Sequence, residues 1–188
     1  FVLEAVREFR TRDDATPVVL MGYLNPVEIR GYARFAADAK AAGVDGLLLV
    51  DLPPEEAGEL RTALASEGIA LILLASPTTP DARIDLLCRD AQGYLYYVSY
   101  AGVTGADRLD TGEAGDRLDR IRAGATVPVV AGFGIKDAAS AAAMARSAEG
   151  VVVGSALVAT LSEAVDVADA QARAQAFLAP LRAALDAA

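Results

Sequence analysis

The sequence VPVVAGFGI at residues 127–135, followed by VVVGS at residues 151–155, decides the fold class. In both stretches a short apolar run ends in a glycine turn that leads into a helical pattern. Continuous runs rich in Val are typical of parallel strands that are buried on both faces. Two such units in succession predict an α/β protein with a parallel sheet.

The same strand–helix unit repeats along the rest of the chain. The chain opens in a helical pattern, and one helix from Asn25-Pro26 to Ala42 is predicted because Asn is a good N-cap and Pro fits the first turn. Another helix is expected from Pro53-Pro54 to Glu67, and helices are expected over residues 156–187. Apolar strands are expected at residues 17–23, 45–50, 69–74, 94–99, 127–131 and 150–153.

Strict alternation of strand and helix leaves a doubly wound sheet or a (β/α)8 barrel. A dinucleotide-binding sheet would carry a G-x-G-x-x-G turn after its first strand, and this sequence has none there. The loops after the last two strands of (β/α)8 barrels commonly bind phosphate, and the two glycine turns stand at those places. We therefore expect a TIM (β/α)8 barrel of which residues 1–188 supply about six βα units, strands 3 to 8, as one partial domain.

Composition narrows the class of function. The chain has 17 Lys and Arg against 26 Asp and Glu, so its net charge of −9 argues against a nucleic-acid partner. No apolar run reaches the roughly 20 residues that span a bilayer, so no membrane partner is expected. The single cysteine, Cys88, fits a reducing, cytoplasmic compartment. Without His or a cluster at metal-ligand spacing, we expect no metal, and acid–base chemistry falls mainly to carboxylates or tyrosines.

Three places could carry chemistry. The glycine turns at Gly132–Gly134 and Gly154-Ser155 could bind phosphate through backbone N–H groups, or they could simply make tight turns. The long segment at residues 99–106 could be a lid or a surface loop. Asp51, at the end of a predicted strand, could be a catalytic carboxylate or the N-cap of a helix.

Five segments in order form a recognisable set: LMGYLNP at 20–26, GVDGLLLVDLPPEE at 43–56, YYVSYAGVTGA at 96–106, VPVVAGFGI at 127–135 and VVVGSALV at 151–158. Together they resemble the alpha subunit of tryptophan synthase. The resemblance implies a TIM barrel that cleaves indole-3-glycerol phosphate to indole and glyceraldehyde 3-phosphate by a retro-aldol reaction. It also implies an alpha–beta heterotetramer in which the beta subunit carries PLP and this chain carries no cofactor.

The resemblance assigns roles to residues that match the family's motifs. Thr104 would be a supporting lid residue, while Asp51 and Pro53 would face the beta subunit. The family's catalytic glutamate and aspartate would precede Phe1, so residues 1–188 alone are expected to be inactive. The remaining substrate-binding residues would be Gly132, Gly134, Gly154, Ser155 and Gly105 for the phosphate, and Tyr96, Leu48, Leu20 and Met21 for the indole.

Two other readings stay open on the residues alone. Another phosphosugar barrel, an isomerase or an epimerase, would share the two glycine turns without needing the SYAGVTGA segment. A non-catalytic module would keep the phosphate site and the surface for the beta subunit. Turnover of indole-3-glycerol phosphate separates the enzymes, and stimulation of a beta subunit without turnover would indicate the module.

Overall fold

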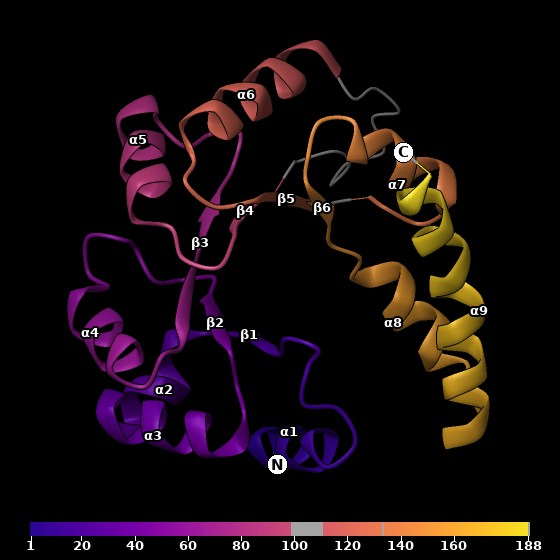
Figure 1. Ribbon diagram of the computed structural model, residues 1–188, viewed down its shortest axis with the longest axis horizontal. Coiled ribbons are helices and arrows are strands. Elements are labelled where there is room, and N and C mark those ends of the chain that lie inside the picture. The colour runs from indigo at the N-terminus through magenta and orange to yellow at the C-terminus, as the bar shows by residue number, and fades with distance from the viewer. Residues whose placement is uncertain (99–110, 133, 188) are drawn as a thin grey trace. The chain divides into compact units, whose positions relative to one another are not determined.

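A computed structural model describes residues 1–98, 111–132 and 134–187. Its strands form one six-stranded sheet in the order β1-β2-β3-β4-β5-β6, so each strand lies beside the next one in the sequence (Figure 1). The pairs β1/β2, β2/β3 and β5/β6 run parallel, which confirms the predicted fold class. The strands are β1 Val19–Gly22, β2 Gly46–Leu49, β3 Ala70–Ala75, β4 Leu95–Val98, β5 Val129–Gly132 and β6 Gly150–Val151.

The chain divides into two compact units. The first comprises Phe1–Leu74 and Asp90–Leu95, and the second comprises Ala75–Arg89 and Tyr96–Ala188. The earlier expectation of one domain over residues 1–188 stays a prediction.

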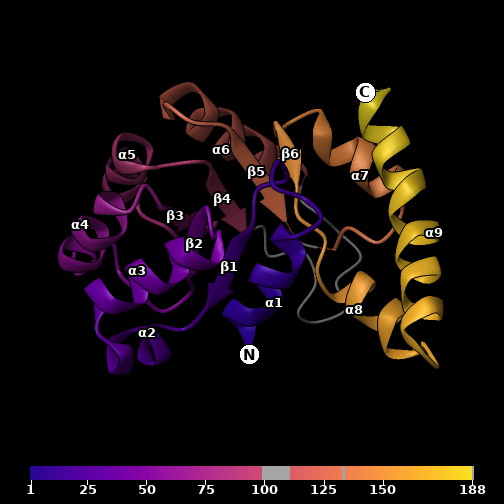
Figure 2. The same ribbon diagram turned by 60° about the horizontal axis from the view of Figure 1, so that its bottom comes forward.

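The first unit packs helices against strands of differing burial, and β1 has no fully buried residue. Every residue of β2 is buried, as expected of a central parallel strand. Helices α3 and α4 lie side by side in both views (Figures 1 and 2). The helices of this unit are α1 Val2–Arg10, α2 Leu24–Arg30, α3 Tyr32–Ala42 and α4 Gly58–Ser66.

The prediction of a single helix from Asn25 to Ala42 is wrong, because the helix is interrupted at Gly31. There the backbone has φ +83°, a value that favours glycine, and two helices result. The N-cap of α2 is Tyr23 rather than Asn25. The helix expected directly after Pro53-Pro54 begins only at Gly58.

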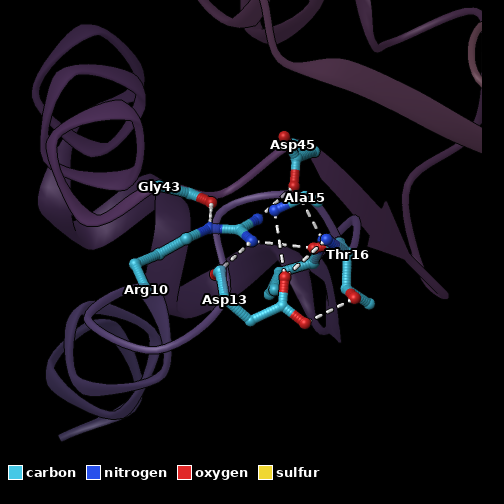
Figure 3. Close-up of polar contacts among 7 residues, drawn as sticks. Arg10, Asp13, Ala15, Thr16, Gly43 and Asp45 are labelled. Atoms are coloured by element: carbon cyan, nitrogen blue, oxygen red, sulfur yellow. Dashed lines mark hydrogen bonds and ion pairs between the residues drawn. The ribbon is translucent and has the colours of Figure 1, made fainter.

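Arg10, the last residue of α1, contacts the segments that lead into β1 and β2 (Figure 3). Arg10 donates Nε to the Gly43 carbonyl at 2.8 Å and Nη1 to the Thr16 carbonyl at 2.7 Å. Its Nη2 forms an ion pair with Asp45, whose Oδ2 also accepts the Val18 N–H at 2.7 Å. The guanidinium thus fixes the start of β1 against the turn that precedes β2.

The second unit ends in helices that share a core. In both views α9 runs alongside α7 (Figure 2). Buried Ile135, Ala141 and Leu181 pack with Phe177 and Leu185. The N-cap of α7 is Asp137, whose carboxylate accepts the Ser140 N–H in a capping box. The helices of this part are α5 Asp81–Asp90, α6 Thr111–Gly124, α7 Ala138–Ala145, α8 Ser155–Ser162 and α9 Val167–Asp186.

Within the described ranges, none of the helices combines the length and the apolar character that crossing a bilayer requires.

Candidate functional site

Gly132, the last residue of β5, is in close contact with an aromatic ring from β4. A Cβ atom built on Gly132 would lie 2.4 Å from Tyr96 Oη, 2.7 Å from Tyr96 Cε2 and 2.8 Å from Val152 Cβ. Tyr96 is only 9% exposed, so its ring fills the space that a side chain at position 132 would need. The structure thus brings two predicted site residues together, and Val152, which the sequence did not single out, completes the contact.

Of the two predicted anion turns, Gly134 and the Gly154-Ser155 pair are exposed, whereas Gly132 is buried. Gly134 has φ +67°, in the left-handed region that favours glycine. Gly154 is the N-cap of α8 and Ser155 its first residue, and no side chain caps this helix end. A Cβ atom built on Gly154 meets nothing within 4 Å. Backbone N–H groups at this N-terminus are therefore open to an anion, which the helix dipole favours.

Strand register separates the residues predicted to flank an indole. Met21 pairs with Leu48, whereas Leu20 pairs with Leu47. Paired residues of parallel strands point to the same face, and neighbours along a strand point to opposite faces. Met21 and Leu48 consequently share one face of the sheet, and Leu20 lies on the other. Leu48 is 2% exposed and Met21 is 62% exposed.

Asp51 holds the start of a neighbouring helix. Its Oδ1 accepts the N–H of Leu24, the first residue of α2, at 2.8 Å. The carboxylate follows β2 while the helix follows β1, so the contact joins two loops at the carboxyl ends of paired strands. Asp51 is thus not the N-cap of the helix that follows it; its carboxylate instead holds the N-terminus of α2, whose N-cap is Tyr23. Pro53 is half-buried, and its carbonyl accepts the Glu56 N–H at 3.0 Å.

The loop after β3 forms a compact turn that the sequence analysis did not mark as a site. We call Ser76, Thr78 and Thr79 the hydroxyl turn. The Ser76 N–H donates to Thr79 Oγ1 at 2.9 Å, and the Thr79 N–H donates to the Ser76 carbonyl at 3.0 Å. Ser76 Oγ lies 3.0 Å from Thr78 Oγ1 and 3.2 Å from Thr79 Oγ1. The run SPTTP could have signalled this turn, because Ser and Thr hydroxyls often bond nearby backbone.

Arg117 on α6 reaches this turn. Its Nη2 donates to the Thr79 carbonyl, and its Nη1 lies 3.6 Å from Asp81 Oδ1. Arg117 Nε and the hydroxyl of Tyr97 are both buried without a hydrogen-bond partner. Burial raises the pKa of Tyr97, and the charge of Arg117 opposes that rise. The guanidinium of Arg117 therefore lies close enough to Tyr97 for its charge to act on that hydroxyl.

Other predicted residues have simpler outcomes. Cys88 is buried, and burial raises the pKa of its thiol. Thr104 and Gly105 lie outside the described residues. Where the structure describes the chain, it gathers no group of three or more side chains that could hold a metal ion.

Comparison of the sequence with known proteins finds relatives that all belong to one family. The family model described as "Tryptophan synthase alpha chain" matches residues 1–185. The tryptophan synthase alpha chain of Xanthomonas axonopodis pv. citri (strain 306) is 70% identical over 187 residues, which are 99% of this chain and 70% of that protein. The alpha chain of Xanthomonas campestris pv. campestris (strain B100) is 69% identical over 188 residues, which cover 100% of this chain and 69% of that one. The chain thus spans about 70% of the length of these relatives.

Solved structures agree with the sequence comparison. Tryptophan synthase subunit alpha from Legionella pneumophila (strain Paris) superposes with a TM-score of 0.87 at 43% identity, covering 100% of this chain and 69% of that one. A chain of the tryptophan synthase α2β2 complex from Pyrococcus furiosus superposes with a TM-score of 0.85 at 37% identity, covering 96% and 72%.

Proposed function

Because the chain belongs to the tryptophan synthase alpha chain family, we propose that it acts in the cleavage of indole-3-glycerol phosphate to indole and glyceraldehyde 3-phosphate. The observation that carries this proposal is the open, uncapped N-terminus of α8 at Gly154-Ser155, a suitable place for the phosphate of such a substrate.

The phosphate is held by backbone N–H groups rather than by a basic side chain. Gly154 and Ser155 offer the N-terminus of α8, and the exposed Gly134 supplies a second turn in the same unit. Hydrogen bonds from backbone N–H groups to a charged oxygen are stronger than neutral ones. Such a site is compatible with the net charge of −9, because local dipoles bind the anion. Gly105 would assist from the neighbouring segment.

The indole is flanked by apolar side chains and one aromatic ring. Met21 and Leu48 are proposed for this role in the first unit because they share a face of the sheet. The register gives less support to Leu20, which lies on the opposite face. In the second unit Tyr96 is proposed, with its ring held in place by contact with Gly132.

We propose that residues 1–188 do not themselves supply the catalytic carboxylate pair. Three of the acids described near the carboxyl ends of the strands are engaged in holding the fold. Asp51 caps α2, Asp81 pairs with Arg120 at 2.6 Å, and Asp137 caps α7. Proton transfer to the indole carbon and from the glycerol hydroxyl requires acids that are free to exchange protons. Thr104 is proposed to support a catalytic aspartate outside residues 1–188.

The proposed partner is a tryptophan synthase beta subunit, and the proposed compartment is the cytoplasm. Support for the partner comes from the likeness to an alpha chain within the Pyrococcus furiosus α2β2 complex. Asp51 and Pro53 are proposed for the interface, in the loop between β2 and α4. PLP would belong to the beta subunit, and we propose no cofactor for this chain.

A backbone-directed substitution tests the phosphate site. Ser155→Pro removes one N–H at the first position of a helix, where proline is otherwise tolerated. We expect it to weaken binding of indole-3-glycerol phosphate about tenfold or more, because one charge-assisted hydrogen bond is lost. The matched control, Ser155→Ala, keeps the N–H and should weaken binding less. Equal affinity in Ser155→Pro and the wild type, with unchanged unfolding midpoints, would show that the phosphate binds elsewhere.

Indole release from indole-3-glycerol phosphate tests the reaction itself. We expect no measurable release from residues 1–188, with or without the beta subunit. Release should appear when the family's preceding segment is present in cis or in trans. Substantial release from residues 1–188 alone would contradict the placing of the carboxylate pair, and Asp51 would be the first residue to substitute. Stimulation of the beta subunit without turnover in any form would indicate a binding module.

A further inference from the structure

The hydroxyl turn lies where substrates meet this fold. It directly follows β3, and in (β/α)8 enzymes the loops at the carboxyl ends of the strands build the active site. The Ser76 hydroxyl lies 3.0 Å from that of Thr78 and 3.2 Å from that of Thr79. Thr78 is exposed, so its hydroxyl is accessible from outside the protein.

The turn is fixed from the side by a cation on another element. Arg117 on α6 donates to the Thr79 carbonyl and lies near Asp81, the first residue of α5. Its side chain is 26% exposed, so solvent screens the guanidinium less than it would a surface arginine. The charge of Arg117 acts on the hydroxyl of Tyr97, a residue that is 1% exposed. The Thr79 carbonyl and Asp81 hold the partly buried guanidinium in place.

We propose that Arg117 is a positioning residue that fixes the hydroxyl turn so that its hydroxyls meet the polar groups of the phosphosugar substrate. The part of this inference that concerns the substrate rests on the proposed function. The part that concerns the turn stands on the described contacts alone.

Arg120 provides a matched control on the same helix. It lies one turn after Arg117 and pairs with Asp81 Oδ2 at 2.6 Å. Its side chain is 52% exposed, and among the described residues its bonding partner is Asp81 alone. Substituting Arg120 therefore removes a charge of the same sign from the same region without touching the Thr79 carbonyl.

The experiment measures amide hydrogen exchange and substrate affinity in the wild type, Arg117→Met, Arg117→Lys and Arg120→Met. In Arg117→Met we expect the amides of Ser76 and Thr79 to exchange about tenfold faster or more, because a charged donor to the turn is lost. Amides of α7 and α9 should keep their rates. Arg117→Lys should recover part of the protection, and Arg120→Met should change it less than about threefold. Affinity for indole-3-glycerol phosphate should fall about tenfold in Arg117→Met only.

Other outcomes would overturn the assignment. Unchanged exchange at Ser76 and Thr79 in Arg117→Met would show that the turn does not depend on this cation. Uniform acceleration across α7 and α9 as well would show a general contribution to stability. If Arg117→Met does not fold, the comparison between Arg117→Lys and Arg120→Met decides in the same way. A wild-type chain that binds no indole-3-glycerol phosphate would contradict the proposed function, and the exchange rates would then decide the role of Arg117.

Discussion

Replacing Gly132 by alanine should destabilise the second unit by overpacking. The new Cβ atom would lie 2.4 Å from Tyr96 Oη and 2.8 Å from Val152 Cβ, distances that require the ring or the chain beyond β6 to move. Tyr96 is buried and has little room to turn away. Forcing extra atoms into a packed site costs about 1–3 kcal/mol, and contact with two neighbours places Gly132→Ala near the upper end, at about 2–3 kcal/mol. Urea unfolding followed by circular dichroism measures the loss.

A double-mutant cycle tests whether the ring is the cause. Tyr96→Leu removes the hydroxyl and the ring edge while keeping an apolar side chain, so it should absorb part of the cost of Gly132→Ala. We expect the double variant to lose about 1–2 kcal/mol less unfolding free energy than the sum of the losses in the two single variants. Gly154→Ala is the control, since a Cβ there meets nothing, and it should cost less than about 0.5 kcal/mol. Additive effects, or equal stability of the two alanine variants, would refute the packing argument.

Three further substitutions test the framework. Arg10→Met should cost about 1–2 kcal/mol in urea unfolding, because the part-buried Gly43 carbonyl and the exposed Thr16 carbonyl lose this donor. Asp51→Ala should cost about 1 kcal/mol and speed amide exchange at Leu24, whose N–H loses its acceptor. Burial raises the pKa of Glu149, but bonds from a backbone N–H and an arginine outweigh it and hold the pKa below its ordinary value. That carboxylate stabilises the fold above pH 4.5 and loses its effect as the pH falls through its lowered pKa, so Glu149→Gln should cost roughly 1 kcal/mol at pH 7, with solvent screening allowed for, and progressively less below pH 4.5.

The strands could be predicted from the sequence because buried parallel strands consist of continuous apolar runs. The run GLLL at 46–49 is apolar at every position but the glycine, and ALILLA at 70–75 is apolar throughout, as parallel strands covered on both faces require. The ends of α3 and α4 could also be predicted, because glycine commonly follows the last turn of a helix with a positive φ, as Gly43 and Gly68 do here.

Contacts between segments that are distant in the sequence could not be predicted in the same way. The capping of Leu24 by Asp51 depends on which loops meet in space. A glycine turn at Gly132 can be interpreted as an anion site or as a packing requirement. The contact with the ring of Tyr96 shows the packing requirement, and the anion site stays a prediction. The sequence likewise did not show that Arg117 lies beside the Thr79 carbonyl.

The order of the sheet has a consequence for how the chain acquires its structure during synthesis. Val19 pairs with Gly46, Gly46 pairs with Ala70, and Val130 pairs with Gly150. Each of these pairings therefore joins two strands that follow one another in the sequence, with one connection between them. The entropic cost of closing a loop grows with its length, and these loops are short for a parallel sheet. A ribosome-bound chain can therefore pair β1 with β2, and then β2 with β3, before the α9 residues have been synthesised.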